Sequence, residues 1–340
     1  MPTLVRLATL LALLAAVLAF AGCGSSSSGD STLEEEIQQL KSAKRERELA
    51  ELQRKLKAEK AREARRKILQ TPASPAEPKP QSSPSGGGSS AGLAGFDELE
   101  ASLPGQVGLA IGPPGSGPAA TAGGLTIGSA WSTSKVPVAL RVLQEAGGPS
   151  GLSSSQDANI RAALTASDNN AALALFADLE RRYGGAAGAA AAVDEVLAEA
   201  GDTTTHVSSV GRDGFTPFGQ TEWSLELQEL FMSRLAAGCV GSQASRELVL
   251  GLMGEVSSDS WGLGSAGVPA RWKGGWGPGT DGRYLARQMG TLSVEGGEAV
   301  VALAALPDDG SFETAQSMAT AVAQWAAEKA PAFAAAPSGC

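Results

Sequence analysis

The chain has 340 residues, a net charge of −9, one histidine and three cysteines. From Gly95 to the C-terminus it carries thirteen basic and twenty-six acidic residues, a net charge of −13 that excludes nucleic-acid binding by this part. The single histidine, His206, allows at most one Ser-His-Asp triad, and no histidine or cysteine cluster has the spacing of a metal site. We therefore expect no metal and no other cofactor.

The first 22 residues are typical of a secretory signal peptide. Arg6 precedes an apolar run from Leu7 to Phe20, which is too short for a transmembrane span. The run ends in Phe-Ala-Gly before Cys23, a pattern that resembles the lipobox of bacterial lipoproteins. We therefore expect a lipoprotein signal peptide over residues 1–22, lipidation of Cys23 and anchoring to the outer face of the bacterial cell membrane. An ordinary signal peptide with an unmodified Cys23 is the alternative.

Three segments follow the signal. Residues 23–32 are rich in serine and glycine and form a tether. Residues 33–70 contain twelve basic and eight acidic residues and no Gly or Pro, which predicts a charged helix. Its apolar spacing is interrupted at Lys44 and Arg47, so a solvated single helix is favoured over a coiled coil. Residues 71–94, rich in Pro, Ser and Gly, are expected to be a flexible linker.

Residues 95–340 are long enough for one domain, and their patterns indicate both strands and helices. Apolar residues alternate over 107–111 as in a strand, and residues 299–306 form a nearly continuous apolar run, typical of a buried strand. Residues 311–329 and the Ala/Gly-rich stretch 132–253 have helical patterns. We expect an α/β fold in which a sheet is flanked by helices and carries a mostly helical insert.

Three short motifs occur in order within this domain: Ser132-x-x-Lys135, Ser167-Asp-Asn and Lys273-Gly-Gly. The domain has only three lysines and three asparagines; two of the lysines and one of the asparagines, Asn169, lie in these motifs, and Asn170 follows directly. The residues after Ser132 have apolar positions at helical spacing, so we expect Ser132 at a helix N-terminus and Lys135 on the same face. Rare polar residues are therefore concentrated in an ordered set, which favours a catalytic site.

These residue types suit nucleophilic catalysis by serine. A serine hydroxyl needs a base to remove its proton, and a lysine acts as that base when burial or a nearby positive charge lowers its pKa. Backbone N–H groups at a helix N-terminus favour a developing oxyanion. Each motif alone has a simpler explanation, since Ser-Asp-Asn suits a helix N-cap and Lys-Gly-Gly suits a turn. Their occurrence together in this order favours catalysis.

The order Ser-x-x-Lys, Ser-Asp-Asn, Lys-x-Gly resembles the motif set of the penicillin-recognising serine hydrolases, which are the class A β-lactamases and the D,D-peptidases (penicillin-binding proteins). The resemblance covers residues 95–340. It implies that Ser132 is acylated by a β-lactam or a peptidoglycan stem peptide, with Lys135 as its general base. It further implies that Ser167 relays a proton to the leaving nitrogen and that Lys273 faces the cleft from an edge strand.

The resemblance also implies a set of substrate contacts. Asn169 would hydrogen-bond the side-chain amide of the substrate, and the backbone N–H groups of Ser132 and Trp276 would form an oxyanion hole. Gly275 belongs to the Lys-x-Gly motif on the same strand. Arg283 would bind a substrate carboxylate. The alternatives are that Arg283 is a solvated hairpin residue and that Trp276 packs in the core.

Two departures from the family pattern bear on catalysis. Gly274 stands where the family usually has threonine or serine, so the hydroxyl that helps to hold the substrate carboxylate is missing. Class A enzymes carry a Glu-x-x-Leu-Asn signature whose glutamate activates the deacylating water, and the corresponding stretch here, 201–222, lacks it. Asp213 is the only carboxylate strictly inside that loop. We therefore expect slow deacylation; the alternative is a degenerate relative, either binding peptidoglycan or serving as a structural envelope lipoprotein.

Cys239 and Cys340 remain as a pair once Cys23 is set aside. Such a pair normally oxidises in an exported protein, so we expect a disulfide that closes a loop of about 100 residues.

Overall fold

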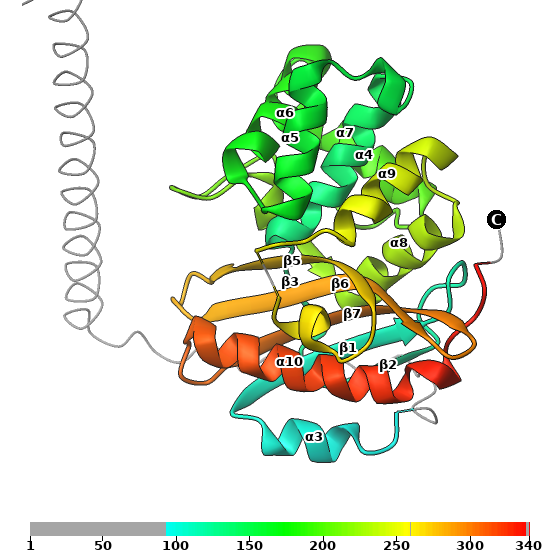
Figure 1. Cartoon of the computed structure of the whole chain (residues 1–340). Helices are drawn as coiled ribbons and strands as arrows, with labels where there is room; N and C mark the ends of the chain where they lie inside the picture. Colours follow the sequence, from blue (N-terminus) through cyan, green and yellow to red (C-terminus); the bar gives the residue numbers. More distant parts are fainter. Residues whose placement is uncertain (1–92, 259, 338–339) are drawn as a thin grey trace, which may run out of the picture. The chain divides into compact units, whose positions relative to one another are not determined.

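The computed structural model describes residues 93–258, 260–337 and 340. This part is built on a five-stranded antiparallel sheet in the order β2-β1-β7-β6-β5, with helices on both faces (Figure 1). Its strands are β1 (Gly105–Gly112), β2 (Ala120–Ala122), β5 (Ala270–Pro278), β6 (Tyr284–Val294) and β7 (Gly297–Pro307). A separate two-stranded sheet pairs β3 (Ile127–Ser129) with β4 (Glu222–Ser224). The predicted sheet with flanking helices is confirmed, and β5, which carries Lys273, is an edge strand.

Eight α-helices occur among the described residues: α3 (Phe96–Ser102), α4 (Lys135–Glu145), α5 (Ser154–Thr165), α6 (Asn169–Tyr183), α7 (Ala186–Glu199), α8 (Leu225–Ala237), α9 (Gln243–Met253) and α10 (Phe312–Lys329). Short 3₁₀ turns are η2 (Trp131–Ser134), η3 (Pro149–Gly151), η4 (Phe218–Gln220), η5 (Gly262–Ser265) and η6 (Ala330–Ala332). The predicted helical insert is confirmed, and it is interrupted only by loops, 3₁₀ turns and β4.

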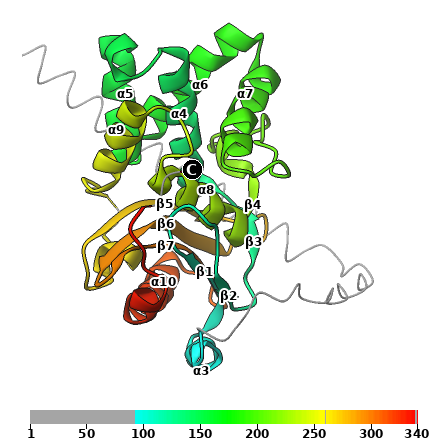
Figure 2. The same ribbon diagram turned by 90° about the vertical axis from the view of Figure 1, so that its right-hand side faces the viewer.

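The central strand β7 contributes residues to a hydrophobic core on each face of the sheet. Val300 and Ala302 belong to the core shared with α8 and the helical insert. Their neighbours Val301 and Leu303 belong to a second core, formed with α10 on the opposite face. Figure 2 shows α10 on one side of the sheet and α8 with the insert on the other. Because both faces are buried, both sets of alternating residues must be apolar, which gives the continuous apolar run of the sequence.

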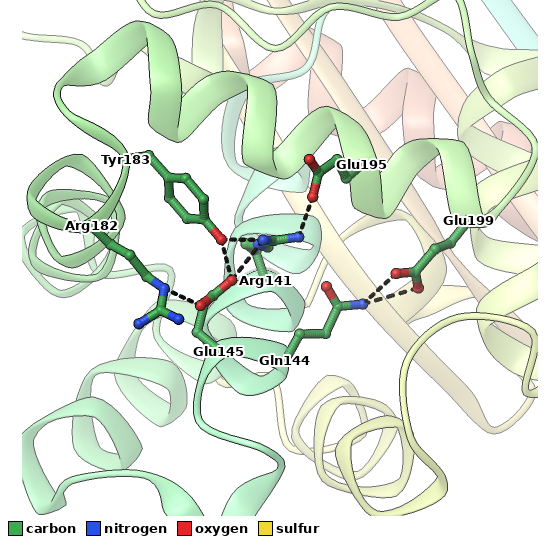
Figure 3. Close-up of polar contacts among 7 residues, drawn as sticks. All are labelled: Arg141, Gln144, Glu145, Arg182, Tyr183, Glu195 and Glu199. Atoms are coloured by element: carbon green, nitrogen blue, oxygen red, sulfur yellow. Dashed lines mark hydrogen bonds and ion pairs between the residues drawn. The ribbon is translucent and has the colours of Figure 1, made fainter.

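The helical insert packs around α4, which contacts α5, α6, α7 and α9. A polar network joins three of these helices at one end of α4 (Figure 3). Arg141 pairs with Glu145 at 2.6 Å and with Glu195 of α7 at 2.7 Å, and it also donates to the hydroxyl of Tyr183 from α6. Glu145 accepts a further ion pair from Arg182. The network fixes α6 and α7 against α4, the helix that directly follows the turn carrying Ser132.

Two observations concern the ends of this part. Leu93, the first described residue, is buried in the core beside Phe96, two residues before the expected domain start at Gly95. At the other end Cys239 and Cys340 form the predicted disulfide, with Cα atoms 5.4 Å apart.

The signal peptide (1–22), Cys23, the tether (23–32), the charged helix (33–70) and nearly all of the linker (71–94) lie outside the described residues. Within the described part, no helix is both long and apolar enough to cross a membrane.

Candidate active site

Ser132 lies in η2, the 3₁₀ turn that leads directly into α4, so the predicted position at a helix N-terminus is confirmed. The turn is fixed by two side chains that bond back to its start: Thr133 Oγ1 donates to the Ala130 carbonyl at 2.5 Å, and Ser134 Oγ donates to the Trp131 carbonyl at 2.6 Å. Trp131 has φ +50°, a conformation that bulky L-residues rarely adopt. Such local strain persists where the surroundings impose it, as at active sites.

Ser167 lies in the connection between α5 and α6 and also has a positive φ, +55°. The next residue, Asp168, is the N-cap of α6 and accepts a hydrogen bond from the Ala171 N–H at 2.8 Å. The Ser-Asp-Asn motif is therefore a helix cap as well as a candidate site, because the cap fixes the turn that directs Ser167 and Asn169 toward the lysines.

Both lysines are buried and both reach the hydroxyl of Ser167. Lys273, 0% exposed, donates from Nζ to Ser167 Oγ at 2.8 Å and to the Gly274 carbonyl at 2.8 Å. Lys135, 1% exposed, donates to the Ser167 carbonyl at 2.5 Å, to Asn169 Oδ1 at 2.8 Å and to Ser167 Oγ at 3.3 Å. The structure therefore brings the three motifs together around one serine hydroxyl.

Strand β5 approaches the nucleophile so closely that it requires glycine. A Cβ atom on Gly275 would lie 2.7 Å from the Ser132 nitrogen and 2.8 Å from the Ala130 carbonyl oxygen. A Cβ atom on Gly277 would lie 2.4–2.6 Å from ring atoms of Trp131. The backbone of β5 therefore runs against the turn that carries Ser132. Trp276, whose N–H is a candidate oxyanion donor, therefore lines the same pocket as Ser132.

A pocket of about 190 Å³ opens at this place. Its polar lining is uncharged and comprises Ser132, Ser167, Asn169 and Thr216. Its aromatic lining comprises Trp131, Phe215, Trp276 and Tyr284. Gly214, Gly277 and Pro278 complete the described lining, which includes no Asp, Glu, Lys, Arg or His. The lysines thus lie behind the serines, and the substrate space itself has apolar and neutral walls.

Part of the 201–222 stretch forms one of these walls, at Gly214, Phe215 and Thr216. Arg212 attaches the wall to the sheet: Nη2 donates to the Pro278 carbonyl at 2.6 Å, and Nε donates to Gln220 Oε1 at 2.6 Å. Its guanidinium lies 4.7 Å from the Phe215 ring centroid and 5.5 Å from that of Trp131. The loop therefore folds over the pocket, but it contributes an aromatic ring there and no carboxylate.

Arg283 and Asp213, which were also singled out in the sequence, lie outside the pocket lining. Arg283 lies in the turn between β5 and β6, and its Nε donates to Asp281 Oδ2 at 2.7 Å. This hydrogen bond lowers the pKa of Asp281. Asp213 is exposed beside the loop wall and does not line the pocket. Neither the expected carboxylate ligand nor a carboxylate base therefore faces the described substrate space.

His206 is also remote from this pocket. Its Nδ1 lies 3.3 Å from Asp194 Oδ2, and 81% of its side chain is exposed. Across residues 93–258, 260–337 and 340, no three His, Cys, Asp or Glu side chains are grouped so that they could hold a metal ion.

Sequence reasoning found Trp276 but missed the other aromatic residues of the pocket, Trp131, Phe215 and Tyr284, and also Arg212. Trp131 had a usable signal, because it directly precedes the nucleophile. Tyr284, Phe215 and Arg212 had none, because each reaches the site through contacts between segments far apart in the chain.

No family model matches the sequence, and no curated protein matches it. Solved structures do match. A β-lactamase from Burkholderia vietnamiensis is 21% identical, with a TM-score of 0.53, and the match covers 70% of this chain and 96% of that one. A β-lactamase from Sphaerobacter thermophilus is 20% identical, with a TM-score of 0.53 and coverage of 70% and 95%. A structure of L2 complexed with relebactam is 23% identical, with a TM-score of 0.52 and coverage of 68% and 94%.

The chain has the β-lactamase fold. The matches span nearly the whole of the other chains, so the described part contains both the sheet and the helical insert of that fold. The fold predicted from the three motifs is thereby confirmed. At these identities the likeness concerns the fold, and the chemistry has to be argued from the residues of the pocket.

Proposed function

We propose that this protein is a serine acyl-transfer enzyme that is acylated at Ser132 by β-lactams or by D-Ala-D-Ala-type peptides. One observation carries the proposal: the Ser167 hydroxyl lies 2.8 Å from Lys273 Nζ and 3.3 Å from Lys135 Nζ, in a pocket that Ser132 also lines. A serine hydroxyl between two buried lysines serves no evident packing purpose. It is, however, well placed to move a proton.

In this proposal, Lys135 in its neutral form removes the proton of Ser132 Oγ, which attacks the substrate carbonyl carbon. The N–H groups of Ser132 and Trp276 donate to the oxyanion that forms. The carbon–nitrogen bond then breaks, and the leaving nitrogen takes a proton from Ser167 Oγ, which Lys273 orients. Lys135 Nζ, 3.3 Å from Ser167 Oγ, returns to that oxygen the proton that it took from Ser132. The product of this half-reaction is an ester between the acyl group and Ser132.

Deacylation is proposed to be slow. It requires a base that activates a water molecule, and losing a general base typically costs about 10²- to 10⁴-fold in the step it serves. No carboxylate is among the described pocket residues, and Phe215 stands on the loop where class A enzymes have their glutamate. The expected behaviour is that of a penicillin-binding protein, which stays acylated.

The test is labelling with a fluorescent penicillin, followed by denaturing gel electrophoresis. The wild-type protein should retain covalent label, and Ser132→Ala should not. Ser167→Ala serves as a second variant, which should label at least tenfold more slowly because the proton relay is removed. An unlabelled wild type would contradict the proposal and favour a domain that binds peptidoglycan without turnover.

We further propose that the enzyme is exported and held at the outer face of the bacterial cell membrane by a lipid on Cys23. The support is the apolar run followed by Ala21, Gly22 and Cys23 in the sequence. The Cys23→Ala variant should lose membrane association and lipoprotein-type processing. Unchanged association and processing of that variant would contradict the anchor while leaving the chemistry at Ser132 untouched.

A further inference from the structure

The cations nearest to the pocket are already engaged with other groups. Lys273 is fully buried and donates to Ser167 Oγ and to the Gly274 carbonyl, each at 2.8 Å. Arg283 is paired with Asp281 at 2.7 Å outside the pocket lining. Arg212 donates to Gln220 Oε1 and to the Pro278 carbonyl, each at 2.6 Å, and lies over the Phe215 ring.

A substrate carboxylate therefore meets only neutral side-chain donors in the described lining, among them those of Ser132, Ser167, Asn169, Thr216 and Tyr284. Position 274 offers no hydroxyl, because it is glycine. Residues from Gly95 onward carry a net charge of −13, which opposes the approach of anions. Hydrogen bonds between two ionised groups are among the strongest in proteins, so the lack of a cationic donor among the described lining residues has a measurable consequence for the binding of a carboxylate.

The aromatic wall continues beyond the pocket. Trp276 stacks on Phe312, with ring centroids 5.5 Å apart and planes 15° from parallel. Tyr284 lies 5.5 Å from the same Phe312 ring, and Trp261 is 6.3 Å from Trp276. All four rings are half-buried. Trp276 and Tyr284 of this cluster line the pocket, and such an aromatic wall suits a neutral, flat group better than a charged one.

We propose that the site accepts acyl donors whose leaving group is uncharged, namely neutral esters and thioesters, and gains little from a carboxylate on that group. This inference rests on the proposed acyl transfer at Ser132. Ser132 Oγ attacks the carbonyl carbon and the bond to the leaving oxygen or sulfur breaks. The proton of Ser132 passes to the alcohol or thiol that departs. Water then hydrolyses the acyl-enzyme, so the net reaction converts ester and water into acid and alcohol or thiol.

The experiment compares two thioesters of benzoylglycine with the full-length protein. Their leaving groups are thioglycolate and thioglycolamide, which differ only in a carboxylate against a carboxamide. The expected kcat/KM for the carboxamide is equal to or greater than that for the carboxylate, and Ser132→Ala should abolish both. A preference of tenfold or more for the carboxylate would overturn the inference while leaving Ser132 chemistry intact.

Two further outcomes separate this inference from the proposed function. If penicillin labels Ser132 but the neutral thioester does not react, the inference is wrong and the proposed function stands. If neither thioester reacts and penicillin gives no label, the proposed function itself has failed, and the inference falls with it.

Two arginine variants complete the design. Arg283→Ala should leave the carboxamide-to-carboxylate ratio within about twofold, because its guanidinium is paired with Asp281. Arg212→Gln should lower kcat/KM for both thioesters by the same factor, since Arg212 holds the Phe215 wall and does not line the pocket. If either variant lowered kcat/KM for the thioglycolate thioester alone, that arginine would be identified as a carboxylate ligand, and the inference would be overturned.

Discussion

Glu229 is the most anomalous single residue outside the candidate site. It lies on α8 and is 0% exposed, and neither carboxyl oxygen has a hydrogen-bond partner among the described residues. Burial raises its pKa well above the usual 4.5. A carboxyl in this setting is stable only when protonated, so the folded state is favoured at low pH relative to the unfolded chain.

The consequence is a pH dependence of stability that one variant removes. Stability from Glu229 is fully present below the unfolded pKa and is lost as the pH rises toward the raised folded pKa, with a limiting slope of about 1.4 kcal/mol per pH unit. Glu229→Gln cannot ionise. In urea unfolding from pH 4 to pH 7, the free energy of unfolding of this variant should therefore increase relative to that of the wild type as the pH rises. Glu226→Gln, an exposed neighbour on α8, is the control. Parallel profiles for wild type and Glu229→Gln would contradict the argument.

The close contact between Gly277 and Trp131 gives a second prediction at the scale of one residue. A methyl group at 277 would lie 2.4–2.6 Å from the Trp131 ring, so the ring and the adjacent Ser132 must shift. Gly277→Ala should destabilise the fold by about 1–3 kcal/mol, as overpacking commonly does, and slow penicillin acylation at least tenfold. The acylation rate is measured by labelling with penicillin and quenching at successive times, and the stability is measured by thermal unfolding.

The matched control is Gly251→Ala in α9, where a Cβ atom would meet nothing within 4 Å. It should stabilise the protein by about 0.5–1 kcal/mol and leave the acylation rate unchanged. Wild-type acylation in Gly277→Ala would show that the position of the Trp131 ring does not control the nucleophile.

The site could be predicted in part, for a physical reason. Ser132 and Lys135 are linked by helix periodicity, and the two other motifs are short local signals, so their residues were found from the sequence. Arg283 was expected either to bind a substrate carboxylate or to be a solvated hairpin residue, and it pairs with Asp281, two residues away. That local pairing competes with any ligand, and residue spacing alone does not reveal it.

At the scale of elements, β7 and β6 show what sequence patterns do and do not contain. β7 was predicted because all its central residues are apolar. β6 carries the buried polar residues Arg287, Gln288 and Thr291, and these interrupt the hydrophobic pattern by which a buried strand is predicted from sequence. Arg287 is accommodated by the Gln228 side chain and by the Gly128 and Trp223 carbonyls, partners that lie 59–159 residues away. Burial lowers its pKa to about 9. Such long-range compensation has no local signature.

The network around Arg141 predicts a difference between two helix ion pairs. Arg141 and Glu145 have side chains only 13% and 17% exposed, so Arg141→Ala takes one of its two ion-pair partners, Arg141 and Arg182, from a mostly buried carboxylate. We expect a loss of about 2–3 kcal/mol in urea unfolding. Arg161→Ala removes a pair with Asp157 whose side chains are 51% and 42% exposed, and it should change stability by less than about 0.5 kcal/mol. Equal effects of the two substitutions would contradict the assigned role of the network.

At the scale of the whole domain, the disulfide is the strongest single constraint on the unfolded chain. It joins Cys239, just after α8, to Cys340, with a sequence separation of 101. In the chain-entropy model a loop of this length is worth about 4–5 kcal/mol, and removal of native disulfides typically costs about 2–5 kcal/mol. The pairing was predictable by elimination, because only two cysteines remain beyond Cys23.

Reduction should therefore lower the free energy of unfolding by several kcal/mol without abolishing the chemistry, since neither cysteine lines the pocket. The Cys239→Ser/Cys340→Ser double variant should show the same loss in urea unfolding and should still label with penicillin. If the midpoint of urea unfolding were the same with and without reductant, the disulfide would not constrain the unfolded chain.

The central claim is that the pocket is complete for acylation and lacks a base for deacylation. Intact-mass spectrometry over time after mixing the protein with benzylpenicillin tests both halves. The account predicts one adduct per chain, absent from Ser132→Ala, that persists long after free penicillin has been removed. Rapid multiple turnover with no lasting adduct would contradict it, because a deacylating base would then have to reach the acyl-enzyme.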